Sequence, residues 1–262
     1  MSKIFDSHCH PQFTQYDADR GEMLARAKST GVSMICIGTD LESSKKGIEL
    51  AQQHENMWAT AGIHPNDTDS SVMNKVHGLV TFVGQPKVVA IGEIGLDYYR
   101  TEGEEAQKKQ KDLFISQLEL AQKVKLPVVL HCRDGKSGSA GRAYPDMIEI
   151  LKNYPDIKGV IHSCTASLNE AKQFLDLGFY LGFNGIITFA WQYDEVVKYV
   201  PLDRILLETD APYLTPEPYR GERNEPSFIG QVVDKIAELK GVFRDEVIVQ
   251  TTQNCIKLFK LA

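Results

Sequence analysis

The sequence lacks several features that would place it in a specialised class of protein. Its five cysteines include no CxxC pair, so neither a structural zinc site of that type nor a dithiol redox site is expected. No stretch approaches the roughly 18 uncharged apolar residues that a membrane-spanning helix needs. The first residues also lack the apolar run of a signal peptide. We therefore expect a cytoplasmic protein that is not associated with a membrane.

Basic residues are in the minority. The chain has 29 Lys and Arg against 35 Asp and Glu, which gives a net charge of −6 over 262 residues. A surface with this overall charge repels polyanions and acidic membranes, so any nucleic-acid substrate must be attracted locally. The hydrophobic share of 42% and the charged share of 24% are those of a soluble globular protein, and they exclude disorder, collagen and coiled coil.

Segments typical of strands and helices alternate along the chain. Short apolar runs typical of buried strands occur eight times, at 3–6, 33–38, 58–63, 88–92, 127–131, 159–162, 179–183 and 204–208. Helical spacing occurs between and after them, for example at 18–29, 41–54, 104–124, 144–153, 168–177, 194–199, 226–240 and 244–261. Eight repeats of about 33 residues match a (β/α)8 TIM barrel of roughly 250 residues. We predict a single α/β domain over residues 1–262, with a doubly wound open sheet as the alternative.

Polar residues gather at the predicted ends of these strands, where the βα loops of a parallel barrel converge and carry its chemistry. Four imidazoles and two carboxylates share this position: His8, His10, Glu93, His131, His162 and Asp210. The i, i+2 spacing of the first two directs both rings to one side of an extended backbone. Taken singly, each histidine is as well explained by a polar loop or a satisfied core position. Together, the six residues supply enough ligands for two adjacent divalent metal ions.

Two such ions would change the local charge. Their charge of +4, less Glu93, Asp210 and one hydroxide, leaves about +1 at the barrel mouth, which suits a phosphate. The sequence therefore predicts hydrolysis by a metal-activated water, with Asp210 and Glu93 as catalytic residues and Asp210 orienting the water. Imidazole-rich sites suit Zn²⁺, Mn²⁺ or Co²⁺, and carboxylates with a phosphate substrate allow Mg²⁺, so the identity of the metal stays open.

Four further residues are candidates for supporting roles. Glu208 precedes Asp210 by two residues and would lie on the same side of an extended strand, where it either accepts a hydrogen bond from a ligating histidine or forms an ion pair inside the barrel. His64 and Arg223 are predicted to bind a substrate phosphate, ahead of Arg133, which follows His131. The alternative for Arg223 is an arginine exposed to solvent at the start of a helix.

Six motifs, in order and spread over nearly the whole chain, resemble those of the TatD family of metal-dependent deoxyribonucleases, which are amidohydrolase-like barrels. They are FDSHCH at 5–10, AGIHP at 61–65, AIGEIGLDY at 90–98, LHCRD at 130–134, ETDAPYL at 208–214 and RNEP at 223–226. The resemblance implies a (β/α)8 barrel, dependence on divalent metal, and cleavage of DNA phosphodiester bonds, often from a strand end. It departs from the family after His162, where Ser163, Cys164 and Thr165 replace the usual Cys-Phe.

Two other functions compete with a nuclease that takes DNA as its substrate. A related barrel hydrolase would use the same activated water on a C–N or carboxylic ester bond. Glu93 argues against it, since many amidohydrolases bridge two metals at this strand with a carboxylated lysine. A module that binds metal and nucleic acid without turnover would be expected to lack a ligand, and none is missing here. No obligate protein partner is inferred.

Overall fold

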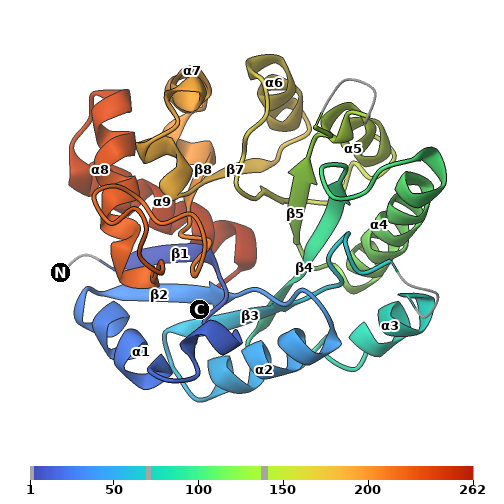
Figure 1. Ribbon diagram of the computed structural model, residues 1–262, viewed down its shortest axis with the longest axis horizontal. Helices are drawn as coiled ribbons and strands as arrows, with labels where there is room; N and C mark the ends of the chain where they lie inside the picture. Colours follow the sequence, from blue (N-terminus) through green and yellow to red (C-terminus); the bar gives the residue numbers. More distant parts are fainter. Residues whose placement is uncertain (1–2, 69–71, 137–140, 262) are drawn as a thin grey trace.

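The centre of the molecule is a sheet of eight parallel strands that follow one another in chain order (Figure 1). The computed structural model describes residues 3–68, 72–136 and 141–261. The strands are β1 (Ile4–Cys9), β2 (Val32–Cys36), β3 (Met57–Ala61), β4 (Val88–Asp97), β5 (Val128–Arg133), β6 (Gly159–Ile161), β7 (Tyr180–Phe183) and β8 (Ile205–Leu207). This single-domain arrangement confirms the predicted (β/α)8 barrel over the doubly wound sheet, whose strands would not be in sequential order.

Helices follow the strands and surround the sheet (Figure 1). They are α1 (Arg20–Ser29), α2 (Leu41–Gln52), α3 (Val72–Leu79), α4 (Glu104–Val124), α5 (Ala143–Leu151), α6 (Leu168–Asp176), α7 (Asp194–Tyr199), α8 (Ile229–Lys240) and α9 (Arg244–Phe259). Short 3-10 turns occur at η1 (Thr14–Tyr16), η3 (Gly185–Thr188), η4 (Trp191–Tyr193), η5 (Leu202–Arg204) and η6 (Pro226–Phe228). Within the described ranges, no helix combines the length and the apolar character that crossing a membrane requires.

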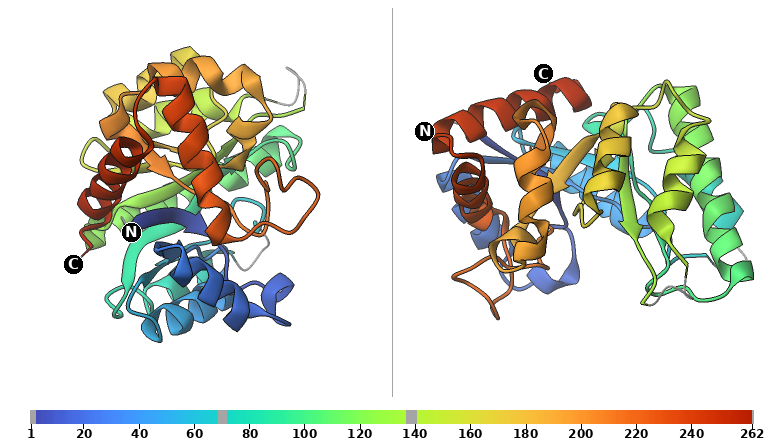
Figure 2. Two further views of the ribbon diagram at one scale, coloured as in Figure 1. Left: turned by 90° about the vertical axis from the view of Figure 1, so that its left-hand side faces the viewer. Right: turned by 90° about the horizontal axis from the view of Figure 1, so that it is seen from above.

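Apolar side chains fill the interior of the barrel and the end at which its strands begin. Phe5, Val129 and Leu206, from strands on different sides of the sheet, belong to one buried cluster with Leu258 and Phe259 of α9. Figure 2 shows α9 (red) at the end of the barrel where the two termini lie. Helix α9 therefore closes the amino ends of the strands, and the opposite end is left for the loops that follow them.

Hydrogen bonds near the ends of β1 and β8 bring the first and last strands together and nearly close the barrel. The backbone N–H of Asp210, just beyond β8, donates to the His8 carbonyl at 2.9 Å. The Ser7 hydroxyl donates to the Leu207 carbonyl, also at 2.9 Å. These bonds bring β1 and the segment after β8 side by side near the barrel mouth.

Two strands carry an extra residue near the mouth. From Asp6 to Cys9, β1 advances three residues while its partner β2 advances two. In the same way, β4 advances three residues from Ile91 to Ile94 while β5 advances two. Such bulges change which side chains face inward. Glu93 lies in the second bulge, and β4 continues to Asp97, so the expectation that the strand ends at Gly92 was wrong.

Candidate metal centre

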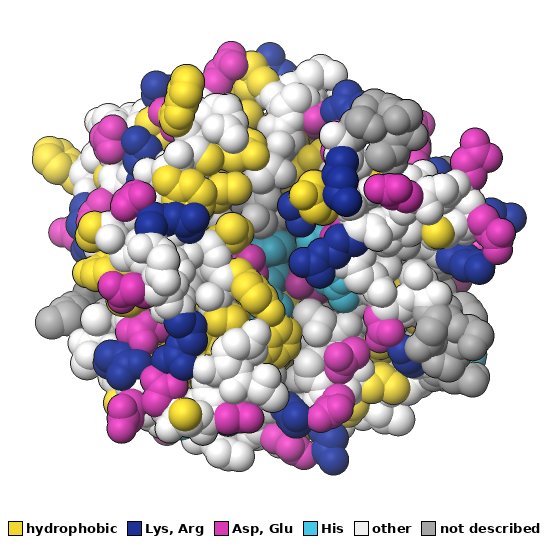
Figure 3. Space-filling model, in the orientation of Figure 1, with side chains coloured by type: hydrophobic (Ala, Val, Ile, Leu, Met, Phe, Trp, Pro, Cys, Tyr) yellow, Lys and Arg dark blue, Asp and Glu magenta, His cyan; other side chains and the backbone are white. Residues whose placement is uncertain are grey.

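The six predicted ligands lie together at the carboxyl end of the barrel. His8 Nε2 is 3.3 Å from His10 Nε2 and 3.5 Å from Glu93 Oε2. Asp210 Oδ1 is 3.6 Å from His8 Nε2 and 3.5 Å from His10 Nε2. Figure 3 shows histidine side chains at the bottom of a central hollow, with acidic side chains beside them. Four potential ligand groups thus converge in one half of the site.

Glu93 connects this half of the site to a second. Its other oxygen, Oε1, is 2.8 Å from His131 Nδ1, 3.7 Å from His64 Nε2 and 3.9 Å from His162 Nε2. His162 Nε2 is also 3.8 Å from Asp210 Oδ1. The two oxygens of one carboxylate therefore face two neighbouring groups of imidazoles, as a ligand shared between two ions would.

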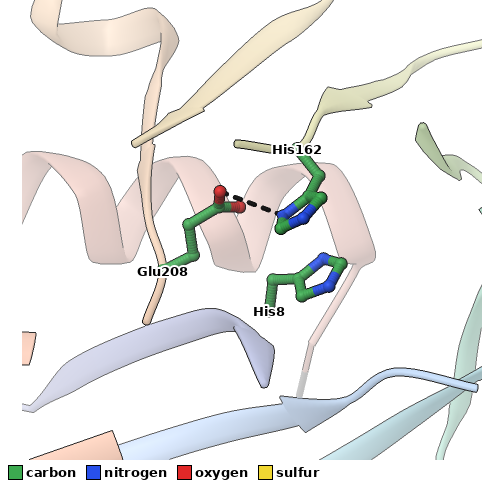
Figure 4. A group of neighbouring side chains, drawn as sticks. All are labelled: His8, His162 and Glu208. Carbon is green, nitrogen blue, oxygen red and sulfur yellow. Dashed lines mark ion pairs between the residues drawn. The ribbon is translucent and has the colours of Figure 1, made fainter. Parts of the chain in front are cut away.

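The second nitrogen of most of these rings is held by a group outside the cluster. His10 Nδ1 is 3.0 Å from the Ile37 carbonyl, and His131 Nε2 is 3.4 Å from Asp97 Oδ2. In Figure 4, Glu208 reaches His162, whose Nδ1 lies 3.0 Å from Glu208 Oε1. Contacts of this kind orient metal-binding histidines and leave the other nitrogen for the ion.

The Glu208 carboxylate occupies a buried position between Ser163 and Gly182. It is fully buried, and its Oε1 accepts a hydrogen bond from the backbone N–H of Ser163, next to His162. Gly182 of β7 lies so close that a Cβ atom there would come within 2.4 Å of Glu208 Oε2. The structure therefore places Glu208 against a histidine of the cluster, the first of the two arrangements expected from the sequence.

The carboxylates of the cluster are held in their charged forms. Burial alone would raise the pKa of Glu93, but the charge of His8 and the hydrogen bond from His131 outweigh burial and keep that pKa well below its usual value. The pKa of Asp210 is lowered in the same way, against the effect of burial, chiefly by His162. Both are therefore available as anionic ligands at neutral pH.

The imidazoles balance this negative charge. Burial would lower the pKa of His131, yet its hydrogen bonds to Asp97 and Glu93 raise it to about 9. Burial is likewise outweighed at His162, where the charge of Glu208 contributes most to a pKa of about 10. In the described chain no lysine or arginine forms an ion pair with Glu93. Imidazole and carboxylate donors without a fixed cation fit divalent metal ions, which would displace the protons of these rings.

A buried carboxylate joins the strands that carry the ligands. Asp6 accepts hydrogen bonds from the Thr209 hydroxyl at 2.6 Å, from the Thr209 N–H at 3.0 Å and from the His8 N–H at 3.2 Å. Burial raises its pKa to about 7. This clamp sets Asp210 beside His8, although the two residues are about 200 positions apart.

His64 lies at the edge of the cluster. Its Nδ1 accepts a hydrogen bond from the Asn66 N–H at 3.2 Å, and burial lowers its pKa to about 4. The ring is therefore neutral at pH 7, and its proton is on Nε2, the nitrogen that faces Glu93. His64, the residue predicted to donate a hydrogen bond to a phosphate, is thus adjacent to the cluster, and its N–H is directed toward the cluster.

Arg223 is placed differently. Its guanidinium is bound to both oxygens of Asp19, at 2.6 and 2.8 Å, and lies 4.5 Å above the ring centre of Tyr16. No described contact joins it to a cluster residue. Its predicted role in binding a phosphate stays a prediction, and the ion pair with Asp19 would have to open for Arg223 to perform it.

Sequence reasoning overlooked Asp97 and Phe13. Asp97 holds His131 and itself accepts a hydrogen bond from the Asn66 side chain at 3.1 Å. Its spacing of four residues from Glu93 would have indicated the same strand face, had the strand been extended beyond Gly92. Phe13 stacks on the His10 ring with 4.4 Å between ring centres, a contact with no signal in the sequence.

The family model described as TatD related DNase matches residues 5–260. The chain belongs to the TatD family. It is 37% identical to the uncharacterized metal-dependent hydrolase YabD of Bacillus subtilis, over 98% of this chain and 99% of that protein. It is 36% identical to a protein of Cronobacter sakazakii named 3'-5' ssDNA/RNA exonuclease TatD, over 98% and 97% of the two chains.

Solved structures agree with this assignment to the TatD family. The TatD homolog YJJV from Escherichia coli superposes with a TM-score of 0.89 at 30% identity, covering 100% of this chain and 99% of that one. The phosphotriesterase homology protein of Escherichia coli, solved with phosphate in its active site, has a TM-score of 0.69 at 15% identity, over 98% and 99% of the two chains, a likeness of fold alone. The chain is therefore a metal-dependent hydrolase of the TatD family, and its histidine and carboxylate clusters can bind metal.

Proposed function

We propose that this hydrolase cleaves phosphodiester bonds of DNA, as an exonuclease acting on single strands or strand ends, with two divalent ions at the cluster. The observation that carries the proposal is the position of Glu93, whose two oxygens face two separate groups of imidazoles 2.8 to 3.9 Å away. The relative named as a single-strand exonuclease supports this choice of substrate.

The residues divide between two ion sites that share one ligand. His8, His10 and Asp210 would hold one ion, His131 and His162 would hold the other, and Glu93 would contact both. Ions bound there supply a water of lowered pKa and positive charge for a phosphate. The net charge of −6 then does not prevent a polyanion from binding, because the attraction is confined to the mouth.

The protein side chains position the reacting groups. Asp210 is held by the clamp between β1 and the segment after β8, so its carboxylate has a fixed direction in which to orient the attacking water and accept its proton. His64, neutral and protonated on Nε2, donates to a phosphate oxygen without adding charge that would repel the ions. The five cysteines are buried free thiols, which supports a reducing compartment such as the cytoplasm.

The test is a cleavage assay with metal added back. Metal-stripped protein is incubated with end-labelled single-stranded DNA, and with RNA in parallel, while Mg²⁺, Mn²⁺ or Zn²⁺ is added separately. We expect a ladder that shortens from one end, appears only with metal and is absent in the Asp210→Asn variant. Asn is a suitable replacement because residue 210 has φ of 56°, a left-handed conformation that Asn tolerates.

Other results would redirect the assignment. Internal fragments in place of a ladder would indicate an endonuclease. A protein that cleaves neither nucleic acid with any metal, but hydrolyses amide or carboxylic ester substrates, would establish the amidohydrolase alternative. A variant with an unchanged rate and a normal circular dichroism spectrum would remove Asp210 from the mechanism.

A further inference from the structure

A cavity of about 540 Å³ opens beside the metal centre, between the segments that follow β5, β6 and β7. Arg133, Tyr144 and Thr165 line it, with Gln192 and Tyr193 of η4. Arg133 follows His131 by two residues and Thr165 follows His162 by three, so the cavity begins where the ligand-bearing strands end. Its polar groups include the Tyr144 and Thr165 hydroxyls, which are 2.9 Å apart.

Arg133 is placed to bind an anion at this opening. Residues i and i+2 of a strand share a face, so Arg133 lies on the same face of β5 as His131, about 6.6 Å further along. Its guanidinium lies 3.7 Å from the ring centre of Tyr99, which follows β4, and Arg133 also lines the cavity. Among the residues that the structure describes, it has no carboxylate partner. Figure 3 shows basic side chains along one side of the histidine hollow.

The other charges of the cavity are accounted for. Arg142 forms ion pairs with Asp134 and Glu170, and Glu170 also caps the first turn of α6. Glu195 lies in the first turn of α7, where a negative charge is favourable for the helix. Among the described residues that line the cavity, Arg133 is thus the cation without a carboxylate partner, in contrast to Arg223 with its bidentate bond to Asp19.

We propose that this cavity is the subsite for the nucleotide adjacent to the bond that is cleaved, with Arg133 binding the phosphate of that nucleotide and Tyr193 and Gln192 facing its base. Arg133 lies two residues beyond the ligand His131 on the same strand, and an arginine forms a bidentate pair with a phosphate. The inference rests on the proposed nuclease activity and deepens it. It assigns the site to a strand of at least two phosphates, as opposed to a small phosphate ester.

The experiment compares two substrates in Arg133→Gln and wild-type enzyme. An oligothymidylate has a second phosphate, and bis(p-nitrophenyl) phosphate has none. Arg133→Gln is expected to lower kcat/KM for the oligonucleotide about tenfold or more, mainly through KM, since a hydrogen bond to a charged group is lost. Hydrolysis of the small diester should stay within about twofold of wild type. Arg133→Lys keeps the positive charge but loses the paired N–H donors of the guanidinium. Its kcat/KM for the oligonucleotide should lie between the values for wild type and Arg133→Gln.

The matched control is Arg204→Gln. Arg204 also lies over a tyrosine, 5.3 Å from the ring centre of Tyr180, but at the amino end of β8, so the variant removes the same charge far from the mouth. Arg204→Gln should leave kcat/KM for both substrates unchanged. Binding of a fluorescent oligothymidylate to the Asp210→Asn protein should also weaken about tenfold when Arg133→Gln is added.

Each failure has a distinct signature. If Arg133→Gln behaves like Arg204→Gln on the oligonucleotide, the subsite is refuted and the nuclease proposal stands. If it impairs both substrates equally, Arg133 acts at the scissile phosphate or through folding, and the subsite is again refuted. If the wild-type enzyme hydrolyses the small diester but no oligonucleotide, the nuclease proposal falls and the subsite falls with it.

Discussion

Glu208 shows how a buried residue can act on the metal site through a neighbouring ring. Its carboxylate has no exposure to solvent and lies 3.0 Å from His162 Nδ1, while the opposite nitrogen of that ring faces Glu93 and Asp210. A negative charge at this position increases the basicity of the imidazole and fixes its rotation. Both effects should strengthen a bond between metal and Nε2.

We predict that Glu208→Gln lowers the affinity for a divalent ion by about 10- to 100-fold, because the amide can still accept from Ser163 but has no charge. Calorimetric titration of the metal-free proteins with Zn²⁺ or Mn²⁺ measures the effect. Glu170→Gln is the control, since Glu170 is also buried but caps the first turn of α6 and does not contact His162. Equal affinities in wild type and Glu208→Gln would show that the ion pair is only structural.

At the scale of residues, the sequence predicted which side chains meet but not their partners. Alternation along a strand placed Glu208 on the side of Asp210, yet its contact with His162 depends on the segment just after β6, where Ser163 is 45 positions away from it in the sequence. The residues around Arg223 in the sequence indicated that it could bind a phosphate. Its bond to Asp19 joins residues 204 positions apart. Local patterns contain no information on such pairings.

At the scale of elements, the strands and their order follow from apolar periodicity, and the bulges do not. The eight predicted strands overlap β1 to β8, and the six predicted ligands meet because parallel strands end at one rim. The bulges in β1 and β4 depend on how each strand pairs with its neighbour, so no pattern in one strand reveals them. The bulge in β4 contains Glu93, which was predicted to follow the end of that strand and lies within it.

Strand β7 contributes to the site by the side chain that it lacks. We predict that Gly182→Ala displaces Glu208, because the new Cβ would be 2.4 Å from its carboxylate. Overpacking of this kind costs about 1–3 kcal/mol, so both the thermal midpoint and the affinity for metal should fall. Differential scanning fluorimetry and metal titration measure the two effects.

The matched control is Gly21→Ala in α1, where nothing lies within 4 Å of the new Cβ. Alanine is about 1 kcal/mol more favourable than glycine inside a helix, so this variant should be slightly stabilised and keep its metal affinity. A Gly182→Ala protein that binds metal like wild type would mean that Glu208 relaxes without loss of its contact to His162.

At the scale of the whole molecule, the ligands connect distant parts of the chain. They come from β1, β4 and β5 and from the segments just after β1, β6 and β8, and bound metal would therefore hold the barrel closed. A ligand at about 100 times its Kd stabilises the folded state by about 2.7 kcal/mol, or roughly 5–10 °C for a protein of this size. We predict a fall in Tm of this order on chelation. The shift should be smaller in Asp210→Asn, and a Tm that is insensitive to chelator would contradict metal binding by the folded chain.

The distribution of charge leads to a final prediction about the binding of nucleic acid. With a net charge of −6, and if the attraction comes from the ions proposed at the mouth, few phosphates should be contacted at once. Two contacts on a single strand give a slope of about −1.4 for log K against log salt, whereas a basic groove that contacts six phosphates would give about −4. Anisotropy titrations of a labelled oligonucleotide with Asp210→Asn protein, at several KCl concentrations and constant metal, measure this slope. A shallow slope would mean that few phosphates are held at once, as expected of an enzyme that removes nucleotides from a strand end, and a steep slope would reveal a basic surface along which a long strand binds.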